Sequence, residues 1–373
     1  MQRKIKVLRL QHGLVEPSNH RLLDEFSGMQ GIEVHAICPR WGIESGSRRV
    51  LRDSRPDITV ARTVLTRRYS TKIFLSHLAA LIKSMKPDVI DIHEEPWSLA
   101  TAQVLAYRRM YSPGSRVLVY SAQNIFKKFP EPFASIEKAA LRSTRTGYAC
   151  SEGVAEVMRR RGFEGRIDIV PLGIDPEEFS FRKHPGELED GILHVGFVGR
   201  VVEEKGVCEL IRAVAAAGPK AKLTLVGPTP EIELTKMLIR ELDAEDRIMT
   251  AGAVEHARVA GLMKQFDVLV VPSRTTPTWK EQFGRVIVEA MSLGVPVAGS
   301  DSGSIPEVIG DAGLVFPEKD MSSLRDILVR LMDNPGELTE ISEAGRERVM
   351  EKFTWKCVAE KMYELYRHVF NER

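Results

Sequence analysis

The sequence predicts an α/β fold made of two doubly wound domains, and three observations lead to this prediction. The chain has 373 residues, more than the ~100–200 that one domain usually contains. Short runs rich in Val, Ile and Leu alternate with longer amphipathic segments, an order typical of parallel sheets covered on both faces. Residues 175–186 are polar, contain two prolines and show no periodicity, as expected of a connection between domains.

The elements follow this alternation along the chain. In the first half, strands are expected at Ile5–Leu10, Glu33–Cys38, Val89–His93, Arg116–Ser121, Gly147–Cys150 and Ile167–Val170. In the second half, they are expected at Leu193–Val198, Lys222–Val226, Arg247–Ala251, Val268–Val271, Val295–Gly299 and Gly313–Val315. We therefore predict an N-terminal domain over residues 1–185, a C-terminal domain over 186–354 and a final helix within 355–373.

Composition excludes several classes of protein. Apolar residues make up 43% and charged residues 28% of the chain, and no stretch approaches the ~18 uninterrupted apolar residues of a membrane span. Residues 1–10 mix charges into an apolar run, which indicates a first strand rather than a signal peptide. The four cysteines are far apart, so neither a zinc site nor a disulfide framework is expected. A cytoplasmic protein is the expectation.

Charge is distributed unevenly along the chain. Residues 1–180 contain 28 Lys and Arg against 20 Asp and Glu, whereas the remainder contains 25 against 31. Much of the excess lies between Arg40 and Lys72, where the arginines are Arg48, Arg49, Arg52, Arg55, Arg62, Arg67 and Arg68. Such a cluster is either a solvated face or a surface that attracts an anionic acceptor or anionic lipid headgroups. Nucleic acid is not an expected partner, because no aromatic residues or known motif accompany these arginines.

Residues 272–297 contain the most informative pattern. Proline at position 272 ends a strand, and a helical pattern runs from Arg285 until Gly294 caps it. The start of this helix at the ligand edge of a parallel sheet suits a phosphate, since its backbone N–H groups are unpaired. Glu281 and Glu289 flank that position, where they are placed to accept hydrogen bonds from the hydroxyls of a hexose and a ribose. The alternative is an exposed loop charge and an ordinary helix residue.

A second loop supplies positive charge. The strand Leu193–Val198 leads into Gly199, and Arg200 and Lys205 follow before a helix that begins near Val207. A diphosphate leaving group requires such charge, because negative charge develops on it as the bond to the sugar breaks. Alternatively, the two cations are surface partners of the neighbouring glutamates.

These elements resemble those of the family-4 retaining glycosyltransferases. The resemblance rests on the GRxxxxKG element at 199–206, the two glutamates eight positions apart in 281–289, and the stretches 170–179, 299–307 and 353–355. It implies the GT-B fold, in which two Rossmann-like domains flank a cleft, the N-terminal domain handles the acceptor, the C-terminal domain binds the donor, and a last helix crosses back to the first domain.

The same resemblance implies the roles of individual residues. Arg200 and Lys205 hold the diphosphate, Glu281 with the backbone at Phe283 and Gly284 holds the donor sugar, and Glu289 holds the ribose. His93 is the candidate cleft residue of the N-terminal domain, and with Arg200, Lys205 and Glu281 it forms the expected catalytic set. The remaining donor-binding candidates are Gly13, Gln123, Asn124, Gly199, Val254, Gln282, Arg285 and Val286.

This chain departs from the family pattern at two places. A paired-glycine loop often follows the first strand, whereas Gly13 is the one plausible close-contact glycine here. A histidine often follows the strand that ends at Ser121, whereas this chain has Gln123 and Asn124, so a different donor sugar is an open alternative. No Asp-x-Asp element is present, and His93 with its two following glutamates supplies too few convergent ligands for a metal. Neither a metal nor another cofactor is expected.

The predicted activity is the transfer of a hexose-type sugar from a UDP- or GDP-sugar to an unknown acceptor, anionic or lipid-linked, in polysaccharide or glycolipid assembly. Peripheral contact with the inner membrane face through the basic N-terminal domain is a further hypothesis. Two alternatives remain open, a sugar-nucleotide epimerase on the same fold and a non-catalytic nucleotide-sugar binding subunit. An NAD-dependent dehydrogenase is disfavoured, because no G-x-G-x-x-G follows the first strand.

Overall fold

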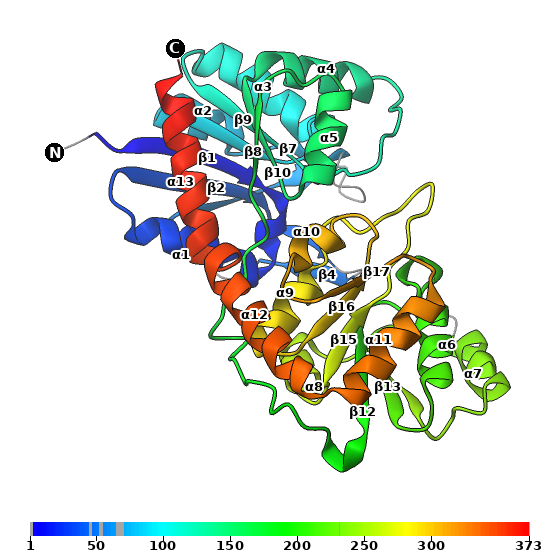
Figure 1. Cartoon of the computed structure of the whole chain (residues 1–373). Coiled ribbons are helices and arrows are strands. Elements are labelled where there is room, and N and C mark those ends of the chain that lie inside the picture. Colours follow the sequence, from blue (N-terminus) through cyan, green and yellow to red (C-terminus); the bar gives the residue numbers. More distant parts are fainter. Residues whose placement is uncertain (1–2, 45–46, 52–54, 65–70, 231, 373) are drawn as a thin grey trace. The chain divides into compact units, whose positions relative to one another are not determined.

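The chain divides into two compact units in a computed structural model that describes residues 3–372 except 45–46, 52–54, 65–70 and 231. Unit 1 comprises residues 1–173 and 355–373, and unit 2 comprises residues 174–354 (Figure 1). The division falls between Gly173 and Ile174, whereas the sequence pattern placed it after residue 185. The reason is a set of long-range hydrogen bonds: Ile174 N–H donates to the Phe353 carbonyl at 2.8 Å, and Ser292 Oγ donates to the Phe179 carbonyl at 3.0 Å. Local polarity does not reveal such bonds.

Unit 1 is built on a parallel sheet of order β11-β10-β9-β8-β1-β2-β5. Its strands are β1 (Ile5–Gln11), β2 (Ile32–Pro39), β5 (Ile58–Ala61), β8 (Val89–His93), β9 (Arg116–Ser121), β10 (Thr146–Ala149) and β11 (Arg166–Ile169). Two antiparallel pairs lie outside it, β3 (Trp41–Glu44) with β4 (Ser47–Val50) and β6 (Thr63–Val64) with β7 (Ile73–Phe74). The sequence pattern did not predict β3 to β7, which are only two to four residues long, too short for a periodicity to show.

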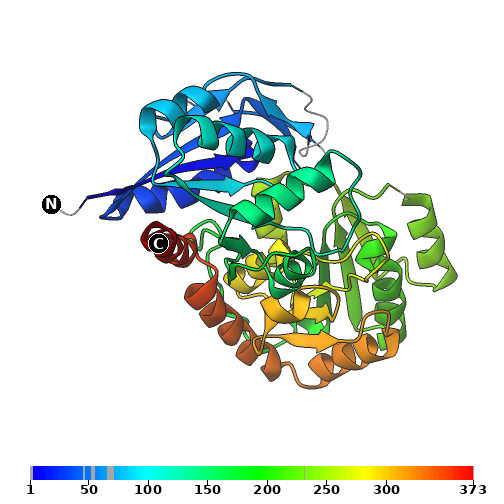
Figure 2. The ribbon, with the colours of Figure 1, turned by 90° about the horizontal axis from the view of Figure 1, so that it is seen from above.

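Helices cover both faces of this sheet. They are α1 (Arg21–Gly28), α2 (Leu78–Met85), α3 (Leu99–Tyr111), α4 (Phe133–Ser143), α5 (Glu152–Arg160) and α13 (Trp355–Asn371). Val7 packs in a core with α1 and α13, whereas its neighbour Leu8 packs in a core with α2 to α5. Successive side chains of a strand point to opposite faces, so a strand buried on both faces has the near-continuous apolar sequence seen in β1. Figure 2 looks along α13 and shows it beside the sheet of unit 1.

Unit 2 repeats this construction with a parallel sheet of order β14-β13-β12-β15-β16-β17. Its strands are β12 (Leu193–Val198), β13 (Ala221–Val226), β14 (Ile248–Gly252), β15 (Val268–Val271), β16 (Val297–Ser300) and β17 (Leu314–Phe316). Its helices are α6 (Val207–Ala217), α7 (Ile232–Glu241), α8 (His256–Met263), α9 (Arg285–Leu293), α10 (Ile305–Ile309), α11 (Met321–Asp333) and α12 (Gly336–Lys352). Side chains of α6, α7 and α11 form one core with the sheet, and α9 contacts β15, β16, α8, α10 and α12.

Candidate functional site

The strand order of unit 2 reverses between β12 and β15. The chain proceeds from β12 outward through β13 to β14, then returns to β15 on the other side of β12. Val195 and Gly196 of β12 pair in parallel with Val268 and Leu269 of β15, so the loops that follow the two strands leave the same edge of the sheet. Open α/β sheets bind ligands at such a reversal, at the carboxyl ends of the strands.

The first of these loops contains Arg200 and Lys205. Lys205 lies in a short 3-10 turn, Glu203–Lys205, which ends at Gly206 in the left-handed region with φ 66°. A Cβ at position 206 would lie 1.9 Å from the Pro272 carbonyl oxygen, so only glycine permits the two loops to touch here. The Arg200 side chain is 61% exposed and lies 3.6 Å from Glu204, which leaves most of its guanidinium accessible to a ligand.

The second loop brings Glu281 to Lys205. The Lys205 ammonium lies 2.6 Å from Glu281 Oε2, and the Ser273 hydroxyl donates to the same oxygen at 3.0 Å. The ring of Trp279 lies under the ammonium, 4.7 Å from its centroid to Nζ, within the range of a cation–π contact. Two residues 76 positions apart in the chain thus form one ion pair, with Glu281 itself largely buried.

The helix α9 begins directly behind this ion pair. Its N-cap is Gly284, in the left-handed region with φ 78°, and it has no side chain that would accept hydrogen bonds from the first turn. The Ile287 N–H donates to the Gly284 carbonyl at 2.9 Å, and the N–H groups at the very start of a helix have no partner within the helix, which suits this end to an anion. Glu289 lies further along α9 and is buried. Of the other candidates, Gln282 and Arg285 are exposed, Val286 is half-buried and Phe283 is buried, with its ring 5.9 Å from that of Phe353.

Val254 and Gly199 occupy the same edge. Gly199 follows β12 and has φ 155°, and its carbonyl oxygen would lie 1.9 Å from a Cβ at Gly227. Val254 is half-buried and follows β14, two strands away from β12. The candidates in the loops after β12, β14 and β15 therefore lie at one edge of one sheet, and Glu289 lies inside the helix α9 that follows the last of these loops.

The candidates of unit 1 lie at the equivalent reversal, between β1 and β8. Gln11 pairs with His93 at the ends of the two strands. His93 Nδ1 lies 2.8 Å from the Tyr148 hydroxyl, and its ring stacks on Tyr120 with centroids 3.9 Å apart. Burial, with smaller contributions from the charges of Arg9 and His12, holds the pKa of His93 well below its usual range. The neutral imidazole is therefore the form that would meet a ligand.

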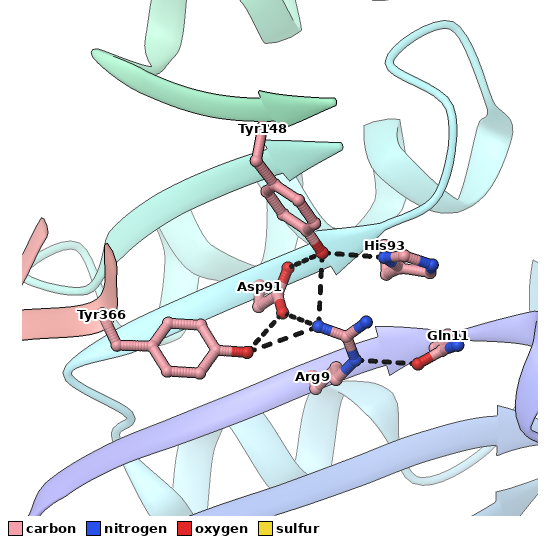
Figure 3. A network of polar contacts seen from close by, with 6 residues as sticks. All are labelled: Arg9, Gln11, Asp91, His93, Tyr148 and Tyr366. Carbon is pink, nitrogen blue, oxygen red and sulfur yellow. Dashed lines mark hydrogen bonds and ion pairs between the residues drawn. The ribbon is translucent and has the colours of Figure 1, made fainter. Parts of the chain in front are cut away.

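Through Tyr148, His93 is joined to a buried polar network (Figure 3). Tyr148 donates to Asp91 Oδ1 at 2.9 Å, Arg9 forms an ion pair with Asp91, and the Tyr366 hydroxyl donates to Asp91 Oδ2 at 2.6 Å. Tyr366 belongs to α13, so the last helix of the chain contributes directly to the network that contains Arg9 of β1 and Asp91 of β8. The sequence pattern did not predict this network, because its members are scattered over strands whose other residues are apolar.

The remaining candidates of unit 1 surround this edge. Gly13 lies in the turn after β1, where a Cβ would meet Asn19 Nδ2 at 3.4 Å, so contacts within unit 1 do not demand a glycine. Gln123 is half-buried and Asn124 is buried in the segment that follows β9. Glu95, which sequence analysis did not single out, accepts hydrogen bonds from Ser121 Oγ at 2.8 Å and the Ala122 N–H at 3.0 Å. Burial raises the pKa of Glu95 to about 7.

Three residues of unit 2 were also missed by sequence analysis, namely Ser273, Arg274 and Trp279. Ser273 and Trp279 contact the Lys205–Glu281 pair, and Arg274 binds Glu209 at 2.6 Å. A signal existed for them, because all three lie in the loop that follows β15 at the predicted ligand edge. Their partners are set by the fold of the loop, which local pattern does not show.

The basic cluster between Arg40 and Lys72 is partly paired. Arg49 lies 3.3 Å from Glu16, Arg55 lies 2.6 Å from Asp24, and the Arg48 guanidinium lies 4.8 Å from the ring centroid of Trp41. Such contacts are typical of a solvated face. Arg62 is exposed, whereas Arg52, Arg67 and Arg68 lie outside the described residues.

The described residues were also compared with the requirements of a metal site and of a membrane-spanning helix. Within the described ranges, no group of three or more His, Cys, Asp or Glu side chains is arranged to hold a metal ion. No helix of the described part of the chain is both long enough and apolar enough to cross a bilayer.

Comparison with known proteins gives consistent matches over most of the chain. Residues 180–348 match the family described as "Glycosyl transferases group 1", and residues 15–178 match "Glycosyltransferase Family 4". The "MMP alpha-(1->4)-mannosyltransferase" of Mycolicibacterium hassiacum is 33% identical over 207 residues, which are 54% of this chain and 48% of that protein. The match therefore spans about half the length of that curated relative.

Two solved structures share the fold over nearly the whole chain. Sucrose-phosphate synthase from Thermosynechococcus elongatus superimposes with a TM-score of 0.72 at 22% identity, covering 98% of this chain and 99% of that one. HepE from Anabaena, in complex with UDP and glucose, superimposes with a TM-score of 0.68 at 18% identity, covering 98% and 100%. The expectation of two Rossmann-like domains of the GT-B kind is thereby confirmed.

Proposed function

Because the chain belongs to the family-4, group 1 glycosyltransferases, we propose that it moves a hexose-type sugar from a UDP- or GDP-sugar to an acceptor hydroxyl with retention of anomeric configuration. The observation that supports this best is the Lys205–Glu281 pair at the ligand edge of unit 2. It places a cation suited to a diphosphate beside a carboxylate suited to sugar hydroxyls, directly in front of the N-terminus of α9.

Charge compensation is the central task of this site. As the bond between the anomeric carbon and the phosphate oxygen breaks, negative charge grows on the departing diphosphate. Lys205 has three N–H donors, of which one serves Glu281, so the others remain for phosphate oxygens. Arg200 adds an exposed guanidinium, and the N–H groups of α9 add fixed dipoles. These residues would do the work of a divalent ion, so we propose a metal-independent reaction.

Binding of the sugar and the nucleotide follows from the same geometry. Ser273 and Lys205 both contact Glu281 Oε2 and so hold the carboxylate in place. Its other oxygen, Oε1, would accept a hydrogen bond from a hydroxyl of the donor hexose. Glu289 would accept the ribose hydroxyls, and the backbone near Val254 would contact the base. In the retaining reaction the departing phosphate oxygen takes the proton of the attacking hydroxyl, which adds to the same face of the sugar that the phosphate leaves.

We assign the acceptor side to unit 1. His93 would meet the acceptor as a neutral imidazole, since burial disfavours its charged form. Gly13, Gln123 and Asn124 belong to the same edge of unit 1 and remain candidates for contact with the donor. The acceptor is proposed to be anionic or lipid-linked, the setting to be polysaccharide or glycolipid assembly, and the location to be the cytoplasm with peripheral membrane contact. HepE was solved with UDP and glucose, and the curated relative is named a mannosyltransferase, which supports nucleotide-linked hexoses as the first donors to test.

The experiment is thermal stabilisation of the full protein by a panel of UDP-, GDP-, ADP- and TDP-sugars in the presence of EDTA. A ligand at about 100 times its Kd adds ~2.7 kcal/mol to the apparent stability of the folded state. Glu289→Ala and Arg200→Ala should abolish the shift. Arg330→Met is the matched control, because its ion pair with Glu337 at 3.1 Å lies on α11 and α12, away from the ligand edge. No shift with any nucleotide sugar would contradict the proposal.

Product analysis then tests the reaction itself. Proton NMR of the first product should show the anomeric configuration of the donor, and an inverted product would rule out the retaining mechanism. Conversion of the nucleotide sugar in the absence of any acceptor would instead indicate an epimerase. Binding without any turnover over a wide range of acceptor hydroxyls would indicate a non-catalytic subunit.

A further inference from the structure

Arg274 joins the two loops of the donor edge. Its guanidinium Nη1 lies 2.6 Å from Glu209 at the start of α6, and its Nη2 forms an ion pair with Glu203 in the turn that carries Lys205. Its backbone N–H donates to the Glu204 carbonyl at 3.0 Å. One residue of the loop after β15 thus contacts the segment 203–209 at three points.

The segment 203–209 holds more negative charge than its own cations balance. It contains Glu203, Glu204 and Glu209, whereas its cation Lys205 is already paired with Glu281. Glu204 lies 3.6 Å from Arg200. Arg274 binds the other two carboxylates, so without it both Glu209 and Glu203, which lies in the same turn as Lys205, would lose this ion pair.

We propose that Arg274 is a positioning residue for diphosphate binding: by holding Glu203 and Glu209, it keeps Lys205 and Arg200 available to the donor's β-phosphate. This inference rests on the proposed function. It adds a residue whose effect is exerted through the two phosphate-binding cations and not by contact with the donor.

Both the shape and the burial of Arg274 suit this role. The planar guanidinium can bind one carboxylate with each terminal nitrogen, which a lysine ammonium on a single stem does less well. The Arg274 side chain is 21% exposed and that of Glu209 is 20% exposed, so solvent screens their attraction less than at an open surface. Loss of Arg274 therefore removes an ion-pair partner from the largely buried Glu209 carboxylate. The Glu203 carboxylate, 78% exposed, would remain in the same turn as Lys205.

The test compares a nucleoside diphosphate with its monophosphate by isothermal titration calorimetry on the full chain, with UDP and UMP or with GDP and GMP. Wild-type protein should bind the diphosphate more tightly, because only the diphosphate has a β-phosphate. In Arg274→Met we expect the diphosphate affinity to fall about tenfold, the equivalent of one weakened charge-assisted hydrogen bond, while the monophosphate affinity stays within about twofold. A merely structural role would weaken both nucleotides together.

A rescue variant separates charge from geometry. If Arg274 acts by occupying the two carboxylates, then Glu203→Gln and Glu209→Gln added to Arg274→Met should restore diphosphate binding to within about twofold of wild type. Arg274→Lys keeps the charge but not the two-pronged contact, and should lose about threefold. This variant, with and without the two glutamine changes, replaces the methionine series if Arg274→Met does not fold. Arg330→Met again serves as the matched arginine control.

The outcomes distinguish this inference from the proposed function. An unchanged preference for the diphosphate in the Arg274 variants, or no rescue by the glutamine changes, would overturn the role of Arg274 while leaving the donor site in place. If wild-type protein binds neither nucleotide while Arg274→Met has ordinary stability, the result contradicts the proposed function. The inference about Arg274 then has no phosphate site on which to act.

Discussion

Removing one hydroxyl from the last helix should destabilise unit 1 measurably. The change is Tyr366→Phe, which keeps the ring that packs against Phe26 at 5.8 Å between centroids and deletes only the oxygen. That oxygen is fully buried, donates to Asp91 Oδ2 at 2.6 Å and accepts from Arg9 Nη1 at 3.3 Å. Burial and the neighbouring Asp91 raise the pKa of Tyr366 well above its usual range, so the hydroxyl is a donor at every practical pH.

The expected magnitude follows from the charge of its partner. A hydrogen bond to a charged group contributes ~1.5–3 kcal/mol, and a carboxylate that loses one of its donors in the interior is left partly unsatisfied. Asp91 keeps Arg9 and Tyr148, so we expect a loss of about 2 kcal/mol, in the middle of that range. For a domain of ~150–250 residues, 1 kcal/mol corresponds to ~2–4 °C, which gives a fall of about 4–8 °C in the transition of unit 1.

Differential scanning calorimetry of the full chain is the assay, with a urea titration for the free energy. Tyr363→Phe is the matched control, because Tyr363 lies on the same helix and its hydroxyl makes no hydrogen bond with a residue that the structure describes. It should change the transition by less than about 1 °C. If the two variants lose the same amount of stability, the reasoning from the Asp91 network is wrong.

Three other perturbations test separate parts of the structure. Burial raises the pKa of Glu95 to about 7, so between pH 4.5 and 7 the folded state binds more protons than the unfolded state, and the free energy of unfolding falls as pH rises. Glu95→Gln should flatten this slope in urea titrations across that range. An unchanged slope would contradict the raised pKa. Gly206→Ala should lower the free energy of unfolding by roughly 2–4 kcal/mol in the same urea titrations, because its Cβ would lie 1.9 Å from the Pro272 carbonyl oxygen. The control is Gly191→Ala, since Gly191 has a similar φ of 69° and open space around it. It should cost only the ~1 kcal/mol of the left-handed backbone. Trp279→Leu should remove the change in tryptophan fluorescence on addition of a nucleotide sugar, since the other three tryptophans of the chain lie outside the loops of the donor edge; a change that persists would place the ligand elsewhere.

The strands with long apolar runs were predictable from the sequence alone. Four strands have the predicted bounds in the structure, namely Val89–His93, Arg116–Ser121, Leu193–Val198 and Val268–Val271. They were predictable because strands covered on both faces have near-continuous apolar sequence that ends abruptly. The short strand β5 (Ile58–Ala61) at the edge of the sheet of unit 1 was not predictable. Its pairing with β2 is a long-range property that a four-residue run does not show.

Charged residues beside glycines were equally visible in the sequence. Arg200, Lys205, Glu281 and the helix that starts after Gly284 were all expected at a ligand edge, since glycine and proline mark the ends of strands and starts of helices locally. Whether the two loops meet was not visible. The contact of Gly206 with the Pro272 carbonyl depends on β12 and β15 being neighbours, which the order of strands in the sheet decides.

The sequence by itself thus determined the α/β alternation, the ligand edges and the types of side chain found there, because these depend on local periodicity and on residues that interrupt it. Only the tertiary structure decided which of these side chains form pairs. Lys205 with Glu281, Arg274 with Glu203 and Glu209, and Tyr366 with Asp91 all join residues far apart in the chain. The physical reason is that sheet order and helix packing set distances between segments, whereas a sequence pattern specifies only the neighbours of each residue along the backbone.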